Sequence, residues 1–374
     1  SDPNVYLNGY SNNTNITSSW VGSVFFINDG VNNPMYFRST DTEIQFFSDV
    51  QWNYTPGVLK TTAGFMRNYC APNVGNILIS GNLTEDLDTG ITVNYPTTVR
   101  WSQAFANTGV PGTWEPTITN VANEQEVPVR GPLIDGFFLG ANFYVCSYWD
   151  TVVFSPIAYQ STTAPIFGVR LFNQGRGLIN NNCWSNTDTM VYGVDARDIW
   201  VFDGSNFESL GNQRVRNWFF ANLNPAYQQR MFMVNNTQKY QIEIYFPDLE
   251  STGWCNKMLS YRYDLDVWNA PRDVDNACMA SEAPYHDGTS FNLASRTVVY
   301  ARGGYGNAKP IQTGITNGFS GNAINAIFER TNISLQTPEG PVPFLSKAYL
   351  HRMAAEVSGT GNLNISVGGA NSVA

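Results

Sequence analysis

The stretch MVYGVDARDIWVFDG, residues 190–204, is a run of strand-forming residues that ends in the turn dipeptide Asp-Gly. Successive side chains of a strand point to opposite faces, so Trp200 and Phe202 share one face. Ile199 and Val201 share the other face. Both faces are therefore apolar, which is typical of a strand whose sheet is packed between two neighbouring sheets.

Runs of the same kind recur along the chain and end in turn residues. They span residues 23–30, 76–82, 136–154, 239–248, 258–268 and 296–306. Charged residues make up only 14% of the 374 residues, against about a quarter in an ordinary domain. Aromatic residues also reach 14%, which argues against disorder. We therefore expect an all-β protein.

The spacing of these runs indicates a repeated sheet. Comparable strand cores lie at Phe25, Ile77, Phe137, Tyr192, Ile242 and Val298. The steps between them are 52, 60, 55, 50 and 56 residues. A period of about 50 residues with several strands per unit is typical of β-propeller blades. The spacing predicts a β-propeller of six to seven irregular blades, the seventh assembled from the two chain ends.

Residues 212–230 break the strand pattern. Apolar side chains recur there at helical spacing, and Pro225 follows the last of them. The apolar positions are Val215, Trp218, Phe219 and Leu223. This pattern predicts a short inserted helix. Arg214 and Arg216 fall off its apolar stripe, and we expect both to be solvated.

The C-terminal part of the chain has a different character. Two alternating segments, around 348–357 and 362–367, flank Ser-Gly-Thr-Gly, which is a hairpin signal. We therefore expect a β-propeller-like domain at residues 1–335 and a C-terminal β-hairpin extension at residues 336–374.

Nothing in the sequence predicts a catalytic, cofactor or metal site. His286 and His351 lie far apart in the sequence, and no serine motif accompanies either of them. The sequence therefore does not indicate a Ser-His-Asp site. His286 precedes Asp-Gly and is expected in a turn. The acidic run at residues 82–90 lacks the spacing of a calcium loop, and we expect a solvated loop.

Acidic and sulfur side chains are scattered. The acids that a propeller glycosidase could use are Asp150, Asp195, Asp203, Glu243 and Asp264, and no pair stands out among them. The cysteines, none in a CxxC pair, are Cys70, Cys146, Cys183, Cys255 and Cys278. We expect buried free thiols rather than disulfides or a zinc site.

The stretch VRWSQAFANTGVPGTWEPT, residues 99–117, resembles the Asp box of glycoside-cleaving propellers at first sight. An Asp box needs an Asp two residues after its Ser, but Ala104 stands two residues after Ser102. The sequence therefore favours a packing role for Trp101 and Trp114 over an Asp box. We expect six aromatic side chains to act as structural anchors, namely Trp101, Trp114, Trp200, Phe202, Trp218 and Trp268.

Several stretches, in a shared order, resemble the tail nozzle proteins of short-tailed bacteriophages, also described as packaged-DNA stabilisation or head-to-tail stopper proteins. The most specific is MVYGVDARDIWVFDGSNFESLGNQRVRNWFFANLN, residues 190–224. The others are VRWSQAFANTGVPGTWEPTITN (99–120), GPLIDGFFLGANFYVCSYWDTVVF (131–154), CNKMLSYRYDLDVWNAP (255–271), FERTNISL (328–335) and YLHRMAAEVSGTGNLNISVGG (349–369). One departure is the segment QAFANTGVPG, which is longer than the Asp-containing turn of the family.

The resemblance implies a non-enzymatic virion protein that forms a homohexameric ring below the portal and the tail adaptor. Such a ring closes the tail channel, retains the packaged DNA and lets it out on infection, without sequence-specific binding. Tail fibres or tailspikes are further partners, and no membrane is involved. Residues 336–374 would belong to a platform domain that continues beyond this sequence. The net charge of −9 is compatible with this role, because an acidic channel wall repels phosphates.

Two alternatives remain open. A carbohydrate-binding or glycan-cleaving propeller of a phage tail would need acids and exposed aromatic residues gathered at one end of the axis. A cellular kelch-like interaction module would need a Gly-Gly…Tyr…Trp consensus that most of the units lack.

Overall fold

The computed structural model describes residues 16–54, 57–157, 165–211, 213–286 and 289–303, and the backbone of five short strands that follow them. The chain divides into two compact units, residues 1–322 and 323–374. In the second unit, β26 (Gln336–Thr337) pairs with β27 (Gly340–Pro341). The C-terminal hairpin expected around 348–367, and His351 with it, lie outside the described residues.

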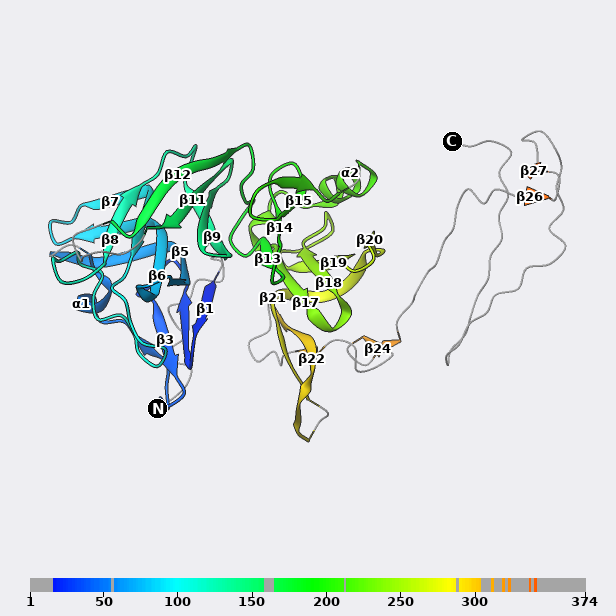
Figure 1. The fold of residues 1–374 in the computed structure, drawn as a ribbon. Helices are drawn as coiled ribbons and strands as arrows, with labels where there is room; N and C mark the ends of the chain where they lie inside the picture. Colours follow the sequence, from blue (N-terminus) through cyan, green and yellow to red (C-terminus); the bar gives the residue numbers. More distant parts are fainter. Residues whose placement is uncertain are drawn as a thin grey trace. The chain divides into compact units, whose positions relative to one another are not determined.

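The first unit is built from antiparallel sheets whose strands follow one another in the chain (Figure 1). The first sheet comprises β1 (Thr17–Val21), β2 (Val24–Asn28), β3 (Met35–Arg38) and β4 (Gln45–Phe46). The second comprises β5 (Val58–Ala71), β6 (Gly75–Leu87), β7 (Thr92–Trp101) and β8 (Asn123–Glu126). The third comprises β9 (Leu133–Leu139), β10 (Asn142–Ser147), β11 (Asp150–Pro156) and β12 (Phe167–Gln174).

The fourth sheet comprises β13 (Trp184–Asn186), β14 (Val191–Val194), β15 (Ile199–Phe202) and β16 (Phe207–Ser209). The fifth comprises β17 (Phe232–Asn236), β18 (Gln241–Phe246), β19 (Cys255–Arg262), β21 (Arg272–His286), β22 (Phe291–Arg302) and β23 (Ile311–Gln312), with β20 (Val267–Trp268) paired to β19. Further along, β24 (Gly318–Phe319) pairs with β25 (Asn322–Ala323). Successive meanders of this kind are the blades of a β-propeller, so the all-β prediction is confirmed with a five-blade arrangement.

The prediction of six to seven blades is not confirmed, since the described residues form five. The strand cores chosen from the sequence fall in β2, β6, β9, β14 and β18, one in each sheet. The sixth, Val298, lies in β22, which belongs to the fifth sheet. The last spacing, from Ile242 to Val298, therefore does not lead to a new blade. It leads to the long β21–β22 hairpin of the same sheet, drawn in yellow in Figure 1.

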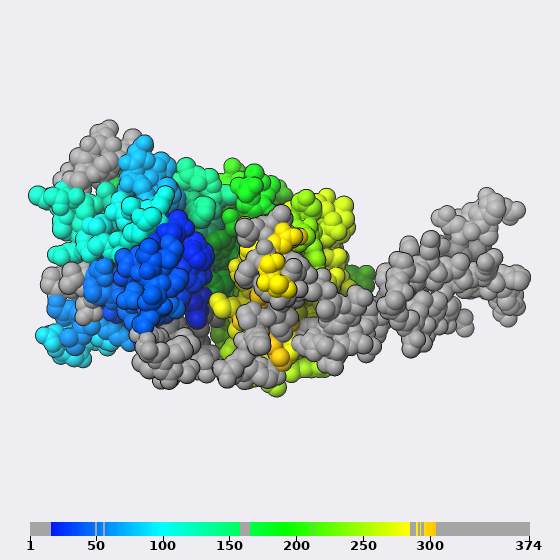
Figure 2. Space-filling view, turned by 90° about the horizontal axis from the view of Figure 1, so that it is seen from below, coloured from blue at the N-terminus to red at the C-terminus, as the bar shows by residue number. Residues whose placement is uncertain are grey.

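Apolar clusters join each sheet to the next. One cluster joins the first sheet to the second, which lie side by side in Figure 2 (blue, then light blue to cyan). Others join the second to the third, the third to the fourth and the fourth to the fifth. Trp200 and Phe202 pack toward the third sheet, while Ile199 packs toward the fifth. The sandwiched strand predicted at residues 199–202 is therefore confirmed.

The predicted helix is α2 (Gln213–Asn222), the only helix longer than one turn among the described residues. A single turn, α1 (Asp49–Trp52), precedes the second sheet. Phe219 of α2 is fully buried, and its ring lies 5.0 Å from that of Phe246. The helix thus covers the core between the fourth and fifth sheets. Within the described ranges, no helix is long and apolar enough to cross a membrane.

The solvated loop expected at residues 82–90 is wrong for residues 82–87, whereas residues 88–90 do form an exposed turn. Asn82 to Leu87 continue β6, and the side chain of Glu85 is only 1% exposed. Glu85 forms a buried ion pair with Arg100 of the neighbouring strand β7, which also pairs with Glu124. The strand alternation places Glu85 on the covered face, and Arg100 compensates its charge there.

The cysteine prediction holds in part. All five cysteines are free thiols, and Cys146, Cys183 and Cys255 are buried. Cys278 is half-buried, but Cys70 is exposed near the end of β5. Cys70 departs from the expectation because its side chain alternates to the opposite side of the strand from Tyr69 and Ala71, which are buried.

Candidate functional site

The two tryptophans of the stretch 99–117 lie in different apolar clusters. Trp101 belongs to the cluster between the second and third sheets, with its ring 5.2 Å from that of Phe167. Trp114 belongs to the cluster between the first and second sheets, where its ring meets that of Trp52 at 4.8 Å. The segment between them thus connects two cores that lie on opposite sides of the second sheet.

The other expected anchors differ in burial. Trp200 and Phe202 are completely buried. Trp218 of α2 is half-buried and meets the ring of Phe246 edge-on at 6.1 Å. Trp268 is half-buried, and its Nε1 donates a hydrogen bond of 3.3 Å to the carbonyl of Leu210.

The five acids that a glycosidase could use do not come together. Asp150 is paired with Arg130, Asp195 with Arg176, and Asp264 with Arg262. Asp203 accepts backbone hydrogen bonds in its own turn, which lower its pKa.

Glu243 is buried in the fifth sheet and accepts hydrogen bonds from three neutral side chains. Its donors are Asn236 Nδ2 at 2.8 Å, Gln241 Nε2 at 2.6 Å and the Tyr245 hydroxyl at 2.7 Å. Burial and the adjacent Glu243 carboxylate raise the pKa of Tyr245 well above its usual value. His286 ends β21, and the Asp-Gly pair that follows it lies outside the described residues.

A polar cluster that the sequence did not indicate joins four of the sheets. Asp135 of β9 is completely buried and accepts hydrogen bonds from Arg67 Nε at 2.9 Å and Arg67 Nη2 at 2.6 Å. The backbone N–H of Asn182 and Nε1 of Trp184 donate to the same carboxylate at 3.0 and 2.9 Å. Arg67 also donates to the carbonyl of Ser18 in β1. We name these residues the Arg67–Asp135 joint.

The joint is not a candidate ligand site, because both carboxylate oxygens of Asp135 already accept hydrogen bonds from protein donors. Nδ2 of Asn182 is occupied as well, since it donates to the carbonyl of Ile16 at 2.8 Å. Asp135 lies 68 residues from Arg67 and 47 from Asn182 in the sequence. No local pattern connects residues so far apart, which is why sequence reasoning missed the joint.

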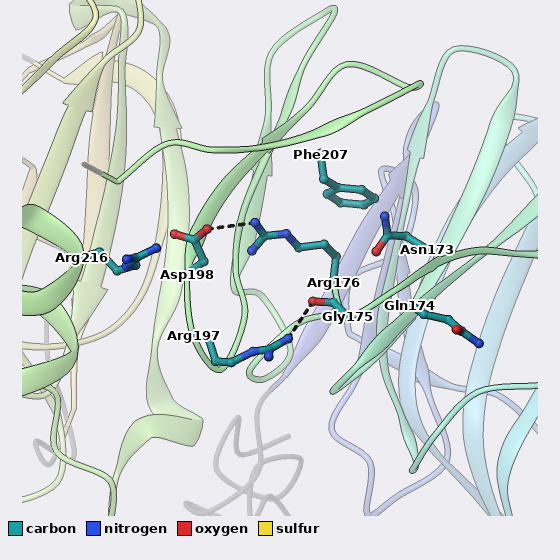
Figure 3. Close-up of a pocket in the computed structure, with 8 residues that line it drawn as sticks. All are labelled: Asn173, Gln174, Gly175, Arg176, Arg197, Asp198, Phe207 and Arg216. Atoms are coloured by element: carbon teal, nitrogen blue, oxygen red, sulfur yellow. Dashed lines mark hydrogen bonds and ion pairs between the residues drawn. The ribbon is translucent and has the colours of Figure 1, made fainter. Parts of the chain in front are cut away.

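A pocket of about 440 Å³ lies where β12, the β14–β15 turn, β16 and α2 meet (Figure 3). We name it the arginine pocket. Its lining consists of Asn173, Gln174, Gly175, Arg176, Arg197, Asp198, Phe207 and Arg216. Arg216, expected to be solvated, is half-buried and extends from α2 into this region, whereas Arg214 is exposed.

The carboxylates at the pocket are already paired. Arg176 forms ion pairs of 3.0 Å with Asp195 and with Asp198. Burial lowers the pKa of Arg176, but these two carboxylates raise it by more. The second oxygen of Asp195 accepts the backbone N–H groups of Arg197 and Asp198, both at 2.7 Å. The second oxygen of Asp198 accepts the Ser209 hydroxyl at 2.9 Å.

The remaining two arginines keep donors available. Arg197 is exposed, and its Nη2 donates one hydrogen bond of 3.2 Å to the carbonyl of Gly175. Within the part of the chain that the structure describes, the guanidinium of Arg216 has neither a hydrogen bond nor an ion pair. Three arginines and one aspartate, Asp198, thus line the pocket, and Asp195 is the second carboxylate paired with Arg176, so positive charge is in excess. The geometry can hold an anion.

The structure offers no comparable arrangement for a metal ion. Over the described ranges, no group of three or more His, Cys, Asp or Glu side chains is placed to hold one.

The fold and the arginine pocket define an all-β protein of β-propeller type with a cationic pocket. No protein-family model matches the chain, and no curated protein matches it. Among solved structures, it is similar to the extracellular domain of a one-component system from B. thetaiotaomicron, with a TM-score of 0.42 and 11% identity. That match covers 78% of this chain and 32% of the other, so this chain spans about a third of that protein's length.

Two further solved structures are similar at the same level. One is Hsv2 of Kluyvelomyces marxianus, with a TM-score of 0.39, 7% identity and coverage of 87% of this chain and 75% of that one. The other is the SapL1 lectin in complex with α-methyl fucoside, with a TM-score of 0.40, 11% identity and coverage of 78% and 89%. At these scores the likenesses assign neither a family nor a ligand.

Proposed function

We propose that this chain is a structural virion protein, the tail nozzle of a short-tailed bacteriophage. In this role it forms the distal DNA channel as a homohexameric ring, retains the packaged genome and allows its ejection. The support is the ordered series of stretches that resemble that family, the most specific of which spans residues 190–224.

The observation that carries the proposal is where this stretch lies in the fold. It builds β14, β15, β16 and α2, and it supplies apolar side chains to the clusters on both sides of the fourth sheet. Trp200, Phe202 and Phe219 are all completely buried. The resemblance therefore rests on residues that build the scaffold, as a shared structural role requires.

The surface of the first unit is compatible with assembly into a ring. Trp20, Ile91 and Ile118 are 62%, 58% and 78% exposed. Permanent interfaces are enriched in aromatic side chains and depleted of charge, and this chain is both aromatic-rich and poor in charge. Closed rings use heterologous contacts between two different surface patches, so such residues need not face one another in a single copy.

The partners follow from the same proposal. The ring would dock on the tail adaptor and portal complex and would carry tail fibres or tailspikes. Packaged DNA would pass through it without sequence-specific binding, because a chain with a net charge of −9 gains little from releasing counterions.

The particle mass and symmetry of the purified chain test this proposal. Mass photometry combined with negative-stain electron microscopy should show six copies around one axis, and a tail adaptor ring should bind coaxially. A chain that stays monomeric when mixed with phage adaptor and portal complexes contradicts the proposal. Cleavage of a glycan by such a monomer would favour the enzyme alternative.

A further inference from the structure

We propose that the arginine pocket binds an acidic sugar, that is, a pyranose with a carboxylate group, as found in surface polysaccharides. This inference does not depend on the nozzle proposal, since it concerns a pocket within a single copy of the chain.

The excess positive charge selects an anion. The carboxylates of Asp195 and Asp198 are held by Arg176 and by hydrogen bonds from the β14–β15 turn, so they are not available to Arg216 as close partners. Arg216 is half-buried and therefore partly desolvated already. A planar guanidinium binds a carboxylate with two parallel hydrogen bonds, which is stronger than a neutral contact.

The aromatic side of the pocket selects a ring with an apolar face. The Phe207 ring stacks on that of Phe202, with centroids 4.3 Å apart, and meets the Trp200 ring edge-on at 5.0 Å. These contacts hold Phe207 in place, while the ring itself is only half-buried and lines the pocket. Figure 3 shows it above Arg176 and beside Asn173. A fixed aromatic surface can cover the C–H face of a pyranose without a new entropic cost of ordering the side chain.

Two amides supply the contacts that hydroxyl groups need. Asn173 and Gln174 end β12 on the side opposite α2, and both line the pocket. A carboxamide can donate and accept at once, which matches sugar hydroxyls. The volume of about 440 Å³ falls within the range of about 300–1,000 Å³ that small-ligand pockets occupy.

A nucleic acid phosphate is the competing anion, and the surroundings disfavour it. A nucleic acid needs an extended row of cations, whereas here three arginines gather in one pocket of a chain with a net charge of −9. The Phe207 ring would also have no role in binding an isolated phosphate, which has no apolar face.

The experiment is a titration of the purified full chain with D-glucuronic acid, D-glucose and inorganic phosphate. NMR measures the binding of each ligand. We expect saturable binding of glucuronic acid, and binding of glucose at least about tenfold weaker. Arg216→Gln should weaken glucuronic acid binding by about tenfold or more. The matched control is Arg214→Gln, because Arg214 lies in the same helix but is exposed and does not line the pocket. It should bind like the unchanged chain.

Three outcomes overturn the inference. The first is the absence of saturable binding by the folded chain, and the second is equal loss in Arg214→Gln and Arg216→Gln. The third is displacement of glucuronic acid by equimolar phosphate or by a short DNA oligonucleotide, which would assign a phosphate site. Circular dichroism melting of each variant separates lost binding from lost folding. The mass of the particle is measured separately, so failure of this site and failure of the nozzle proposal remain distinguishable.

Discussion

Two clusters of arginine and aspartate lie in the first unit, and they differ in how completely their charges are paired. In the Arg67–Asp135 joint, the side chains of Arg67 and Asp135 are 12% and 0% exposed, and every carboxylate oxygen has a protein donor. In the arginine pocket, Arg176 is 24% exposed, and two further arginines line the open space beside it. The same residue types build a structural connection in one place and a candidate binding site in the other.

The two clusters contain the same residue types. What distinguishes the joint from the arginine pocket is the number of hydrogen-bond donors relative to the number of acceptors. A buried ion pair is costly to desolvate and persists only where additional hydrogen bonds satisfy it. Asp135 has five such donor groups, contributed by Arg67, Gly136, Asn182 and Trp184. At the pocket the arginines outnumber the carboxylates, which leaves donors for a ligand.

The largest expected effect follows removal of the joint's carboxylate. Asp135→Ala removes the buried carboxylate that accepts hydrogen bonds from the Arg67 guanidinium, the Asn182 backbone N–H and the Trp184 indole N–H. We expect it to lower the free energy of unfolding by about 3–5 kcal/mol. Urea unfolding followed by tryptophan fluorescence measures this. Asp264→Ala is the control, because the Asp264–Arg262 pair is at the surface, and no measurable loss is expected. Equal losses in the two variants would contradict the structural role of the joint.

At the pocket, we expect Asp198→Asn to cause a smaller loss of stability and a gain in affinity for glucuronic acid. Asp198→Asn removes one carboxylate from Arg176, but Asp195 still pairs with that arginine. We expect stability to fall by about 1–3 kcal/mol, because a buried charged hydrogen bond is lost. The binding of glucuronic acid should tighten, since positive charge in the pocket increases. Weaker glucuronic acid binding by a folded Asp198→Asn variant would show that Asp198 contacts the ligand favourably.

A third pair, Arg130–Asp150, lies between these extremes, because Asp150 is 2% exposed and Arg130 is 62% exposed. Burial raises the pKa of Asp150, but hydrogen bonds from Arg130 lower it by more, so the pKa lies below its usual value. The ionised form is thus favoured in the folded state, and its contribution to stability is present above the unfolded pKa of about 4. That contribution is lost as the pH falls through the folded pKa.

Thermal unfolding between neutral and acidic pH checks this prediction. The unchanged chain should be more stable than Asp150→Asn at neutral pH, and the difference should shrink as the pH falls below about 4. Parallel curves for the two chains over the whole range would mean that Asp150 does not titrate differently in the folded state.

Among the variants of the joint and the pocket, the smallest expected effect on stability is that of Arg216→Gln. Among the described residues its guanidinium has no hydrogen bond and no ion pair, so the free energy of unfolding should stay within about 0.5 kcal/mol of the unchanged chain. Arg67→Gln, at the joint, should lose several times more, because Asp135 would then keep its charge without a cation. If both substitutions destabilised the chain equally, the contrast between joint and pocket would not hold.

Local pattern was enough to predict much of the scaffold. The alternation at residues 199–202 identified a strand with two covered faces, and the spacing of Val215, Trp218 and Phe219 identified α2. These predictions succeeded because strand and helix periods are set by the backbone and act over a few residues. The count of six to seven blades was not confirmed, because Val298 has a strand pattern that is the same whether its strand starts a blade or extends one. The nozzle family remains a prediction.

The sequence by itself determined that the chain is all-β, where its main strands and its helix lie, and that the strand at residues 199–202 carries apolar side chains on both faces. Only the tertiary structure decided that Glu85 is buried against Arg100, that Asp135 meets Arg67, and that Arg216 reaches the pocket. The physical reason is the range of the interactions. Backbone periodicity is local, whereas the pairing of charges depends on which strands become neighbours. No local sequence pattern predicts that Arg67 and Asp135, which are 68 positions apart, will meet.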